Sequence, residues 1–111
     1  MATAYKNAQL QGTASLSTYG TLYSTGASTT AVISSIVVTN TASASKQYRV
    51  AIMGSAGTPA AANWIVYDAT IAGNDSVALT LGITLGNTQY IRVSSTDNTV
   101  TFSAYLSEIT T

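Results

Sequence analysis

Few side chains in this 111-residue chain could carry out acid, base or nucleophilic chemistry. The chain has no histidine and no cysteine, which excludes Ser–His and Cys–His nucleophile pairs within one chain. A glycosidase needs two carboxylates held at a set separation across a cleft. Asp68 and Asp75 could approach each other across a turn, but both have the setting of ordinary turn or strand-end acids. We therefore expect no catalytic residues, no cofactor and no enzymatic activity.

Signals for a metal or nucleic-acid site are also weak. A calcium site needs several converging oxygen ligands, to which Asn74-Asp75 or Asp97-Asn98 could contribute at a subunit interface. The ordinary interpretation of such pairs is an Asx turn, so no metal site is predicted. The basic residues are scattered and matched in number by acids: Lys6, Lys46, Arg49 and Arg92. Because they form no basic stripe, we expect no nucleic-acid binding.

Charge is sparse throughout the chain. Only 7% of residues are charged, with four Lys or Arg residues against four Asp or Glu residues, while Ser and Thr are abundant. A small domain free in solution normally carries more charge, which keeps it soluble. Hydroxyl groups cost less to desolvate than charges, so this composition favours a protein that packs against neighbouring subunits. The alternative interpretation is the drifted composition of a neutral extracellular β-protein.

Length and hydropathy place further limits on the class of protein. The chain has the length of one domain, and its 46% apolar content excludes a disordered chain. No apolar run approaches the ~18 residues of a membrane-spanning helix, so no membrane association is expected. The first residues, MATAYKNAQ, lack the apolar stretch of a secretory signal.

The elements that must position any site are predicted to be strands. In Thr30–Gly54 two runs rich in β-branched residues flank a link of five small residues, Thr41–Ser45. β-Branched residues lose freedom in a helix and pack well on a pleated surface. In the second run Tyr48, Val50 and Ile52 alternate with small or polar residues. The pattern predicts two strands joined by a short loop.

The segment Ser76–Leu85 has the cleanest alternation in the chain. Its large apolar residues occupy every second position and are predicted to share one buried face of a single strand: Val77, Leu79, Leu81, Ile83 and Leu85. Gly82 inside this run suggests a bulge or a close approach of another backbone.

Three further segments are predicted to be strands. In Tyr90–Ser94 we expect Ile91 and Val93 to point inward. Thr99–Ser107 alternates in the same way, with these residues predicted inward: Val100, Phe102, Ala104 and Leu106. In Trp64–Ala69 the period of two puts Trp64 and Tyr67 on opposite faces, so at most one of them belongs to the core.

About seven or eight short strands separated by turn signals predict an all-β fold. The arrangement expected is a single antiparallel β-sandwich or jelly-roll-like domain over residues 18–111. Residues 1–17 are too polar to form a core of their own, and we expect them to form a short N-terminal arm or an edge strand.

The aromatic residues are the remaining candidates for function. Tyr48 and Phe102 are predicted to lie in the core. Exposed Tyr and Trp side chains can form a sugar-binding platform or anchor a protein interface. The interface candidates are the exposed tyrosines and the two isolated leucines of the first segment: Tyr5, Tyr19, Tyr105, Leu10 and Leu16.

Four segments resemble a family of small virion proteins of tailed phages of the podovirus and cyanophage type. The matching pieces are Leu22-Tyr23, Val37–Asn40, Ile65–Asp68 and Asn74–Leu85. The resemblance extends from about Leu22 to Glu108, and Thr25-Gly26 stands where the family has a proline. These are core and turn motifs, so they bear on family membership more than on role.

The resemblance implies a non-enzymatic structural protein of the virion, assembled in the host cytoplasm. We expect a capsid decoration or cement protein that forms a homo-oligomer, with a trimer preferred, and contacts the major capsid protein or tail proteins. The alternative is a tail or fibre component that binds a host surface glycan. A third interpretation, a small secreted lectin-like domain, lacks a signal peptide.

Overall fold

The computed structural model describes residues 2–110, which form nine strands and one short turn of 3-10 helix. The strands are β1 (Ala2–Gln11), β2 (Gly20–Ser24), β3 (Thr29–Asn40), β4 (Lys46–Met53), β5 (Trp64–Ile71), β6 (Ser76–Leu79), β7 (Ile83–Leu85), β8 (Tyr90–Ser95) and β9 (Val100–Thr110). The 3-10 turn, η1 (Ala61–Asn63), precedes β5. Within residues 2–110 there is no α-helix, and no helix long and apolar enough to cross a membrane.

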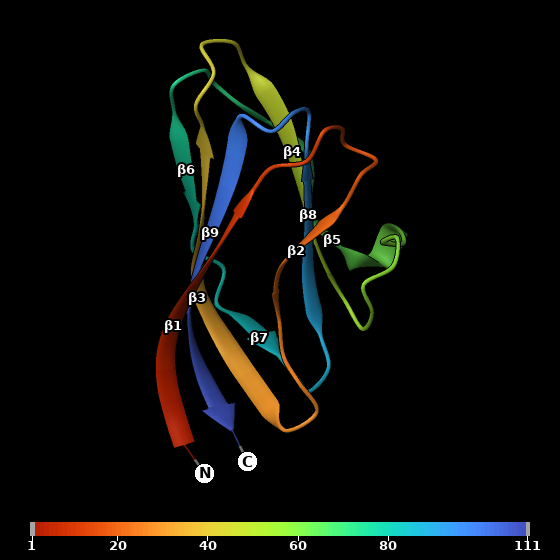
Figure 1. The fold of residues 1–111 in the computed structure, drawn as a ribbon, viewed down its shortest axis with the longest axis vertical. Coiled ribbons are helices and arrows are strands. Elements are labelled where there is room, and N and C mark those ends of the chain that lie inside the picture. Colours follow the sequence, from red (N-terminus) through yellow and green to blue (C-terminus); the bar gives the residue numbers. More distant parts are fainter. Residues whose placement is uncertain (1, 111) are drawn as a thin grey trace.

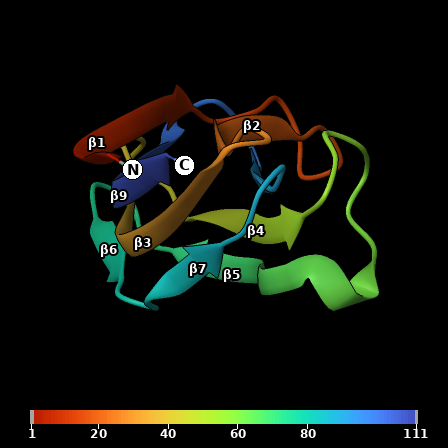
Figure 2. The same cartoon turned by 90° about the horizontal axis from the view of Figure 1, so that it is seen from below.

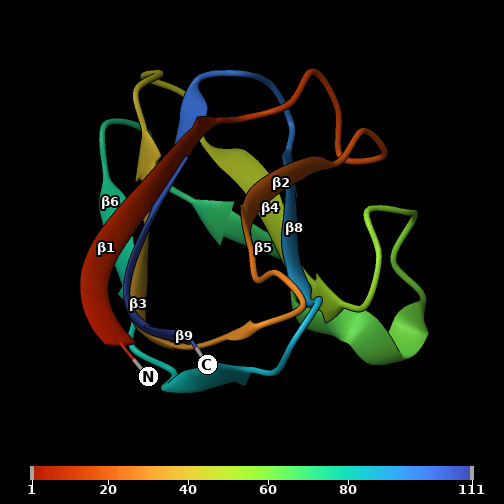
Figure 3. The ribbon, with the colours of Figure 1, turned by 60° about the horizontal axis from the view of Figure 1, so that its bottom comes forward.

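The strands form two antiparallel sheets packed face to face, which confirms the predicted β-sandwich (Figures 1 and 3). The five-stranded sheet has the order β1-β9-β3-β6, with β7 also paired to β3. The four-stranded sheet has the order β2-β8-β4-β5. Neighbouring strands are mostly far apart in sequence, as in Greek-key sandwiches, so most of the pairing is long-range.

The core lies between the sheets and follows the predicted alternation. In β8 and β9 the residues expected to point inward are buried: Ile91, Val93, Val100, Phe102, Ala104 and Leu106. Tyr48 and Phe102 are both in the core, with ring centroids 6.3 Å apart in an edge-to-face arrangement. This geometry sets the positive edge of one ring against the negative face of the other.

The first segment is an edge strand of the sandwich. β1 pairs with β9 from Ala2 to Gln11, so the start of β1 lies beside the end of β9 (Figure 2). Gly12 then passes so close to β9 that a Cβ atom there would sit 2.1 Å from the Val100 carbonyl oxygen. The chain continues to β2 on the opposite sheet. Met1 and Thr111, which belong to the predicted N-terminal segment and sandwich domain, lie outside the described residues.

The prediction of one continuous strand over Ser76–Leu85 is wrong. The segment is split into β6 and β7, which pair with two different stretches of β3. The gap lies opposite a bulge in β3 between Ile33 and Ser35, and Gly82 turns the chain there with a φ of 61°. A positive φ is easily adopted by glycine. Leu81 therefore points out of the core and is 52% exposed, whereas Leu85 is fully buried.

We predict that Leu85→Ala lowers the free energy of unfolding by about 2–5 kcal/mol, because it removes core contacts and leaves a cavity. Leu81→Ala should cost less than about 1 kcal/mol, because the side chain is half exposed. Urea denaturation of both variants measures the two effects. Equal destabilisation would contradict the break between β6 and β7.

Candidate functional site

Two tyrosines predicted as interface residues lie together on the outside of the five-stranded sheet. Tyr5 is 88% exposed and Tyr105 is 43% exposed. The register pairs Tyr5 with Ser107 and Asn7 with Tyr105, so all four point away from the core. We call this surface the uncharged face. Its outward residues on the three longest strands are Thr3, Tyr5, Asn7, Gln9, Gln11, Thr30, Val32, Ser35, Val37, Thr39, Thr101, Ser103, Tyr105, Ser107 and Ile109.

The strands of this sheet keep their charges off the uncharged face. Lys6 and Glu108 are the only charged residues in β1, β3, β6, β7 and β9. Both belong to the inner side of the sheet, because Lys6 pairs in register with Leu106. Their side chains form an ion pair of 2.9 Å, and the Tyr23 hydroxyl also donates to Glu108. These hydrogen bonds, that of Tyr23 first, lower the pKa of the Glu108 carboxyl.

The free edge of β1 borders this face. An edge strand presents unpaired backbone groups that can pair with another chain, and proteins usually protect it with charge, proline or a bulge. β1 has no proline, and its pairing with β9 runs from Ala2 to Gln11 without a register shift. Its one charged residue, Lys6, is compensated by Glu108. The inward-facing Lys6 is the one protection of this kind on β1, and the rest of the backbone edge is available for strand addition.

The outside of the four-stranded sheet carries a different cluster, centred on Arg49. The Arg49 Nε donates to Asp68 Oδ1 at 2.5 Å, and its second terminal nitrogen donates to Oδ2 at 3.2 Å. The first terminal nitrogen donates to the Leu16 carbonyl at 3.2 Å and to the Tyr19 hydroxyl at 3.1 Å. Donation from Arg49 lowers the pKa of Asp68, and the same pairing raises the pKa of Arg49. Every nitrogen of the guanidinium is thus engaged.

Three aromatic rings surround this guanidinium. The Arg49 Cζ lies 4.3 Å from the centroid of the Tyr67 ring and 5.5 Å from that of Trp64. The Trp64 and Tyr67 centroids are 5.1 Å apart, and Tyr19 lies 5.7 Å from Trp64. Cation–π contacts of this kind hold the rings in place. We call Arg49, Asp68, Tyr19, Trp64 and Tyr67 the aromatic–arginine cluster.

The prediction that Trp64 and Tyr67 lie on opposite faces is therefore wrong. The period of two fails because β5 pairs with β4 through two register shifts, one on each side of Val50. At each bulge β5 has one extra residue opposite β4, which reverses the alternation of inward and outward side chains. Asp68 sits at one of these shifts with a φ of 53°, a conformation that Asp tolerates better than most residues. The bulges bring both rings to Arg49.

The other interface candidates have local roles in the described structure. Leu10 packs against the core, so its side chain is used within the sandwich. Leu16 and Tyr19 belong to the link between β1 and β2, which crosses to the four-stranded sheet and contacts Arg49. Arg49 and Asp68 were not selected from the sequence. The only available signal was an arginine at an outward position of β4, a common feature of strands.

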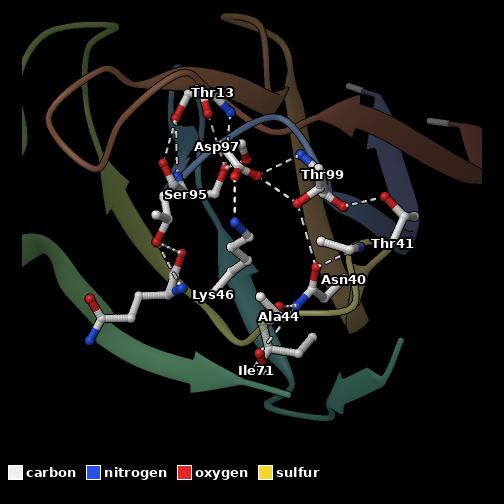
Figure 4. A network of polar contacts seen from close by, with 12 residues as sticks. Thr13, Asn40, Thr41, Ala44, Lys46, Ile71, Ser95, Asp97 and Thr99 are labelled. Carbon is white, nitrogen blue, oxygen red and sulfur yellow. Dashed lines mark hydrogen bonds and ion pairs between the residues drawn. The ribbon is translucent and has the colours of Figure 1, made fainter. Parts of the chain in front are cut away.

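A polar network closes one end of the sandwich (Figure 4). Asn40 is buried, and its amide nitrogen donates to the carbonyls of Ala44, Ile71 and Ala72 at 2.8, 3.3 and 3.2 Å. Its side-chain oxygen accepts from the Ala42 N–H at 3.0 Å, which is the geometry of an Asx turn. Asn40 thereby connects the end of β3 in one sheet to the end of β5 in the other.

Asp97, a candidate calcium ligand, belongs to the same network. It accepts from Lys46 Nζ at 2.7 Å and from the N–H and hydroxyl of Thr99 at 3.0 and 2.5 Å. The hydrogen bond from Lys46, followed by those from Thr99, lowers the pKa of Asp97 to about 2. At the other candidate turn, Asp75 Oδ1 accepts from the Ser76 N–H at 2.9 Å. Residues 2–110 contain no group of three or more acids, histidines or cysteines placed to hold a metal.

Two shallow hollows adjoin one another near the end of β1. Their volumes are about 410 and 470 Å³, and both are lined by Gln11. Polar and apolar groups share the linings, with Leu10 and Phe102 in the first hollow, and Asp97 is the single carboxylate. Because Asp97 is bound to Lys46 and Thr99, neither hollow offers the paired carboxylates that hydrolysis of a glycoside requires.

Comparisons of this chain with protein-family models, curated proteins and solved structures found no match.

The ion pair at Asp97 predicts a pH dependence of stability. Because the pKa in the folded state is about 2, below the value of about 3.9 in an unfolded chain, the carboxylate stabilises the fold above about pH 4. This contribution should disappear as the pH falls toward 2. Asp97→Asn should therefore be less stable than the native chain at pH 7, with a difference that shrinks toward pH 2.

Urea denaturation between pH 2 and pH 7 measures this difference. Lys46→Met provides the control, because in its background Asp97→Asn should have a smaller effect at pH 7. A difference that stays constant down to pH 2 would show that the ion pair does not stabilise the fold.

Proposed function

We propose that this chain is a non-enzymatic structural protein of a phage virion, a capsid decoration or cement protein that assembles with copies of itself. The observation that carries the proposal is the uncharged face bordered by the open edge of β1. The resemblance of Leu22–Glu108 to small virion proteins supports the assignment to a phage particle. A trimer is the preferred oligomer.

The composition of the uncharged face is that of a surface buried against protein. Interface cores are depleted of charged residues and enriched in aromatic residues, Tyr among them. Tyr5, Tyr105 and Val32 supply exposed apolar area, and hydroxyl and amide side chains between them can hydrogen-bond across a contact. In a chain whose charges are few, their complete absence from the outward positions of this sheet favours burial over solvation.

A second copy of the chain is the occupant that fits this surface. Addition of a strand to β1 would pair its free backbone groups, and the adjacent face would then pack against the added subunit. In a trimer the contact is heterologous, so the β1 edge of one copy meets a different patch on the next copy. Three such contacts close a ring and leave no unpaired β1 edge.

The arrangement of the acids supports a role without catalysis. Asp68, Asp97 and Glu108 are each bound to a basic residue, and Asp75 bonds the next backbone N–H. A general acid or base must be free to reach a substrate proton. Purified protein incubated with glycan and ester substrates should give no turnover above buffer. Activity that Asp68→Asn or Asp75→Asn abolishes would contradict this part of the proposal.

We predict that the chain is oligomeric at micromolar concentration and that Tyr5→Ala/Tyr105→Ala weakens the association at least tenfold. Truncation of interface aromatics commonly costs more than about 1.4 kcal/mol, which corresponds to that factor. Light scattering across a dilution series measures the association. Tyr67→Ala, which removes an exposed tyrosine from the other sheet, should leave it unchanged.

Binding to stripped particles tests the virion assignment. Copy number then separates the two virion roles, since a decoration protein occurs in many copies per particle and a tail or fibre component in few. Point substitutions are preferable to removal of residues 1–17, because that deletion would expose the edge of β9 that pairs with β1. A monomer that associates with no particle would overturn the structural-protein assignment.

A further inference from the structure

We propose that the outside of the four-stranded sheet holds a binding site for an uncharged saccharide, with the exposed Tyr67 ring, held by Trp64, as the stacking surface and Asp68 and Gln47 as partners of its hydroxyl groups. The site is independent of the proposed assembly surface, because its residues lie on the opposite sheet. It assigns a function to the aromatic–arginine cluster, which the uncharged face does not include.

The Tyr67 ring is both rigid and accessible. Its ring centroid lies 4.3 Å from the Arg49 Cζ, and the edge-to-face contact with Trp64 at 67° fixes its orientation. Despite these contacts, 57% of the residue remains exposed. A ring held in place before binding loses little entropy when a ligand stacks on it. The C–H groups of a pyranose carry partial positive charge and suit the negative face of an aromatic ring.

Hydrogen-bonding groups lie beside this ring. Asp68 follows Tyr67 in β5, and its side chain is 33% exposed although both carboxylate oxygens accept from Arg49. A carboxylate has about four lone-pair sites, so it can accept from sugar hydroxyls as well. The exposed Gln47 reaches the Asp68 backbone carbonyl at 3.5 Å and adds an amide to the same patch. An apolar partner would not use the remaining hydrogen-bonding capacity of these groups.

The charge balance of the cluster favours an uncharged ligand. Asp68 compensates Arg49, and the two donors of the first terminal nitrogen of Arg49 are taken by the Leu16 carbonyl and the Tyr19 hydroxyl. The other arginine of this sheet, Arg92, donates to the Thr21 hydroxyl at 2.7 Å and to the Tyr19 carbonyl at 3.4 Å, toward the β2 side. No free guanidinium therefore stands beside Tyr67 for a phosphate or a sugar carboxylate, which a nucleic acid or an acidic polysaccharide would require.

Affinity electrophoresis of the full chain tests the site, with dextran, galactomannan or mannan as uncharged probes and alginate as the acidic probe. We expect at least one uncharged polysaccharide to retard the native protein. Tyr67→Ala should weaken that binding about tenfold, because it removes the stacking ring. Leu81→Ala is the control, since it removes an exposed apolar side chain from the segment between β6 and β7, outside both proposed surfaces, and should leave retardation unchanged.

Three results would overturn the proposal. They are no retardation by any uncharged polysaccharide, retardation by alginate alone, and equal retardation of the native protein and the Tyr67→Ala variant. A further alternative is that the cluster is a contact between subunits. Light scattering tests it, because Tyr67→Ala would then dissociate the oligomer. A second variant, Gln47→Ala, leaves the aromatic packing intact and should reduce retardation by a smaller factor than Tyr67→Ala does. Loss of saccharide binding with the oligomer retained would leave the proposed function untouched.

Discussion

The buried amide of Asn40 is the interaction on which the arrangement of the two sheets depends. A buried polar side chain is tolerated only when its hydrogen bonds are satisfied, and Asn40 satisfies them with backbone groups of the β3–β4 loop and the end of β5. The β3–β4 loop and the loop after β5 lie so close that a Cβ atom on Gly73, in the second loop, would sit 2.0 Å from the Ser43 carbonyl oxygen in the first. Any side chain at Gly73 would force the loops apart and weaken the hydrogen bonds from Asn40 to the Ile71 and Ala72 carbonyls. The sheets are therefore joined at this end by the hydrogen bonds of Asn40 and by close backbone contact, as well as by core packing.

A second constraint is the small number of charges, and their placement makes the two outer faces of the sandwich chemically different. Three of the acids each pair with a basic residue, and each pair has a defined position in the fold. Lys6 and Glu108 lie on the inner side of the five-stranded sheet, and Lys46 and Asp97 lie in the network at the Asn40 end. Arg49 and Asp68 lie on the outside of the four-stranded sheet. This distribution leaves the outside of the five-stranded sheet uncharged, so the two outer faces differ in the contacts that they can make.

Sequence patterns predicted the strands and buried positions that depend on local periodicity. The predictions were wrong where the register between paired strands shifts. Alternating apolar residues identified β4, β8 and β9 and the inward positions of Val93 and Phe102, because burial on one face requires a period of two. The same rule misplaced Leu81 and Trp64, since each lies next to a bulge or break that reverses the alternation. Bulges depend on the partner strand as well as on the bulged one, so a single sequence carries little signal for them. Tyr5 and Tyr105 were selected for exposure alone, and only the pairing of β1 with β9 brings them to one face.

The misplaced residues are also those that form the aromatic–arginine cluster. An unbulged β5 would send Trp64 or Tyr67 toward the core, and Arg49 would then lie under a single ring at most. Two register shifts within eight residues weaken the ladder of an edge strand, and a left-handed Asp68 adds backbone strain. The bidentate ion pair and the cation–π contacts offset that cost only because Arg49 lies at the centre of the bulged segment. A bulge also protects an edge strand such as β5 from pairing with another chain. The same two bulges bring Trp64 and Tyr67 to Arg49, so edge protection and the aromatic–arginine cluster share one cause.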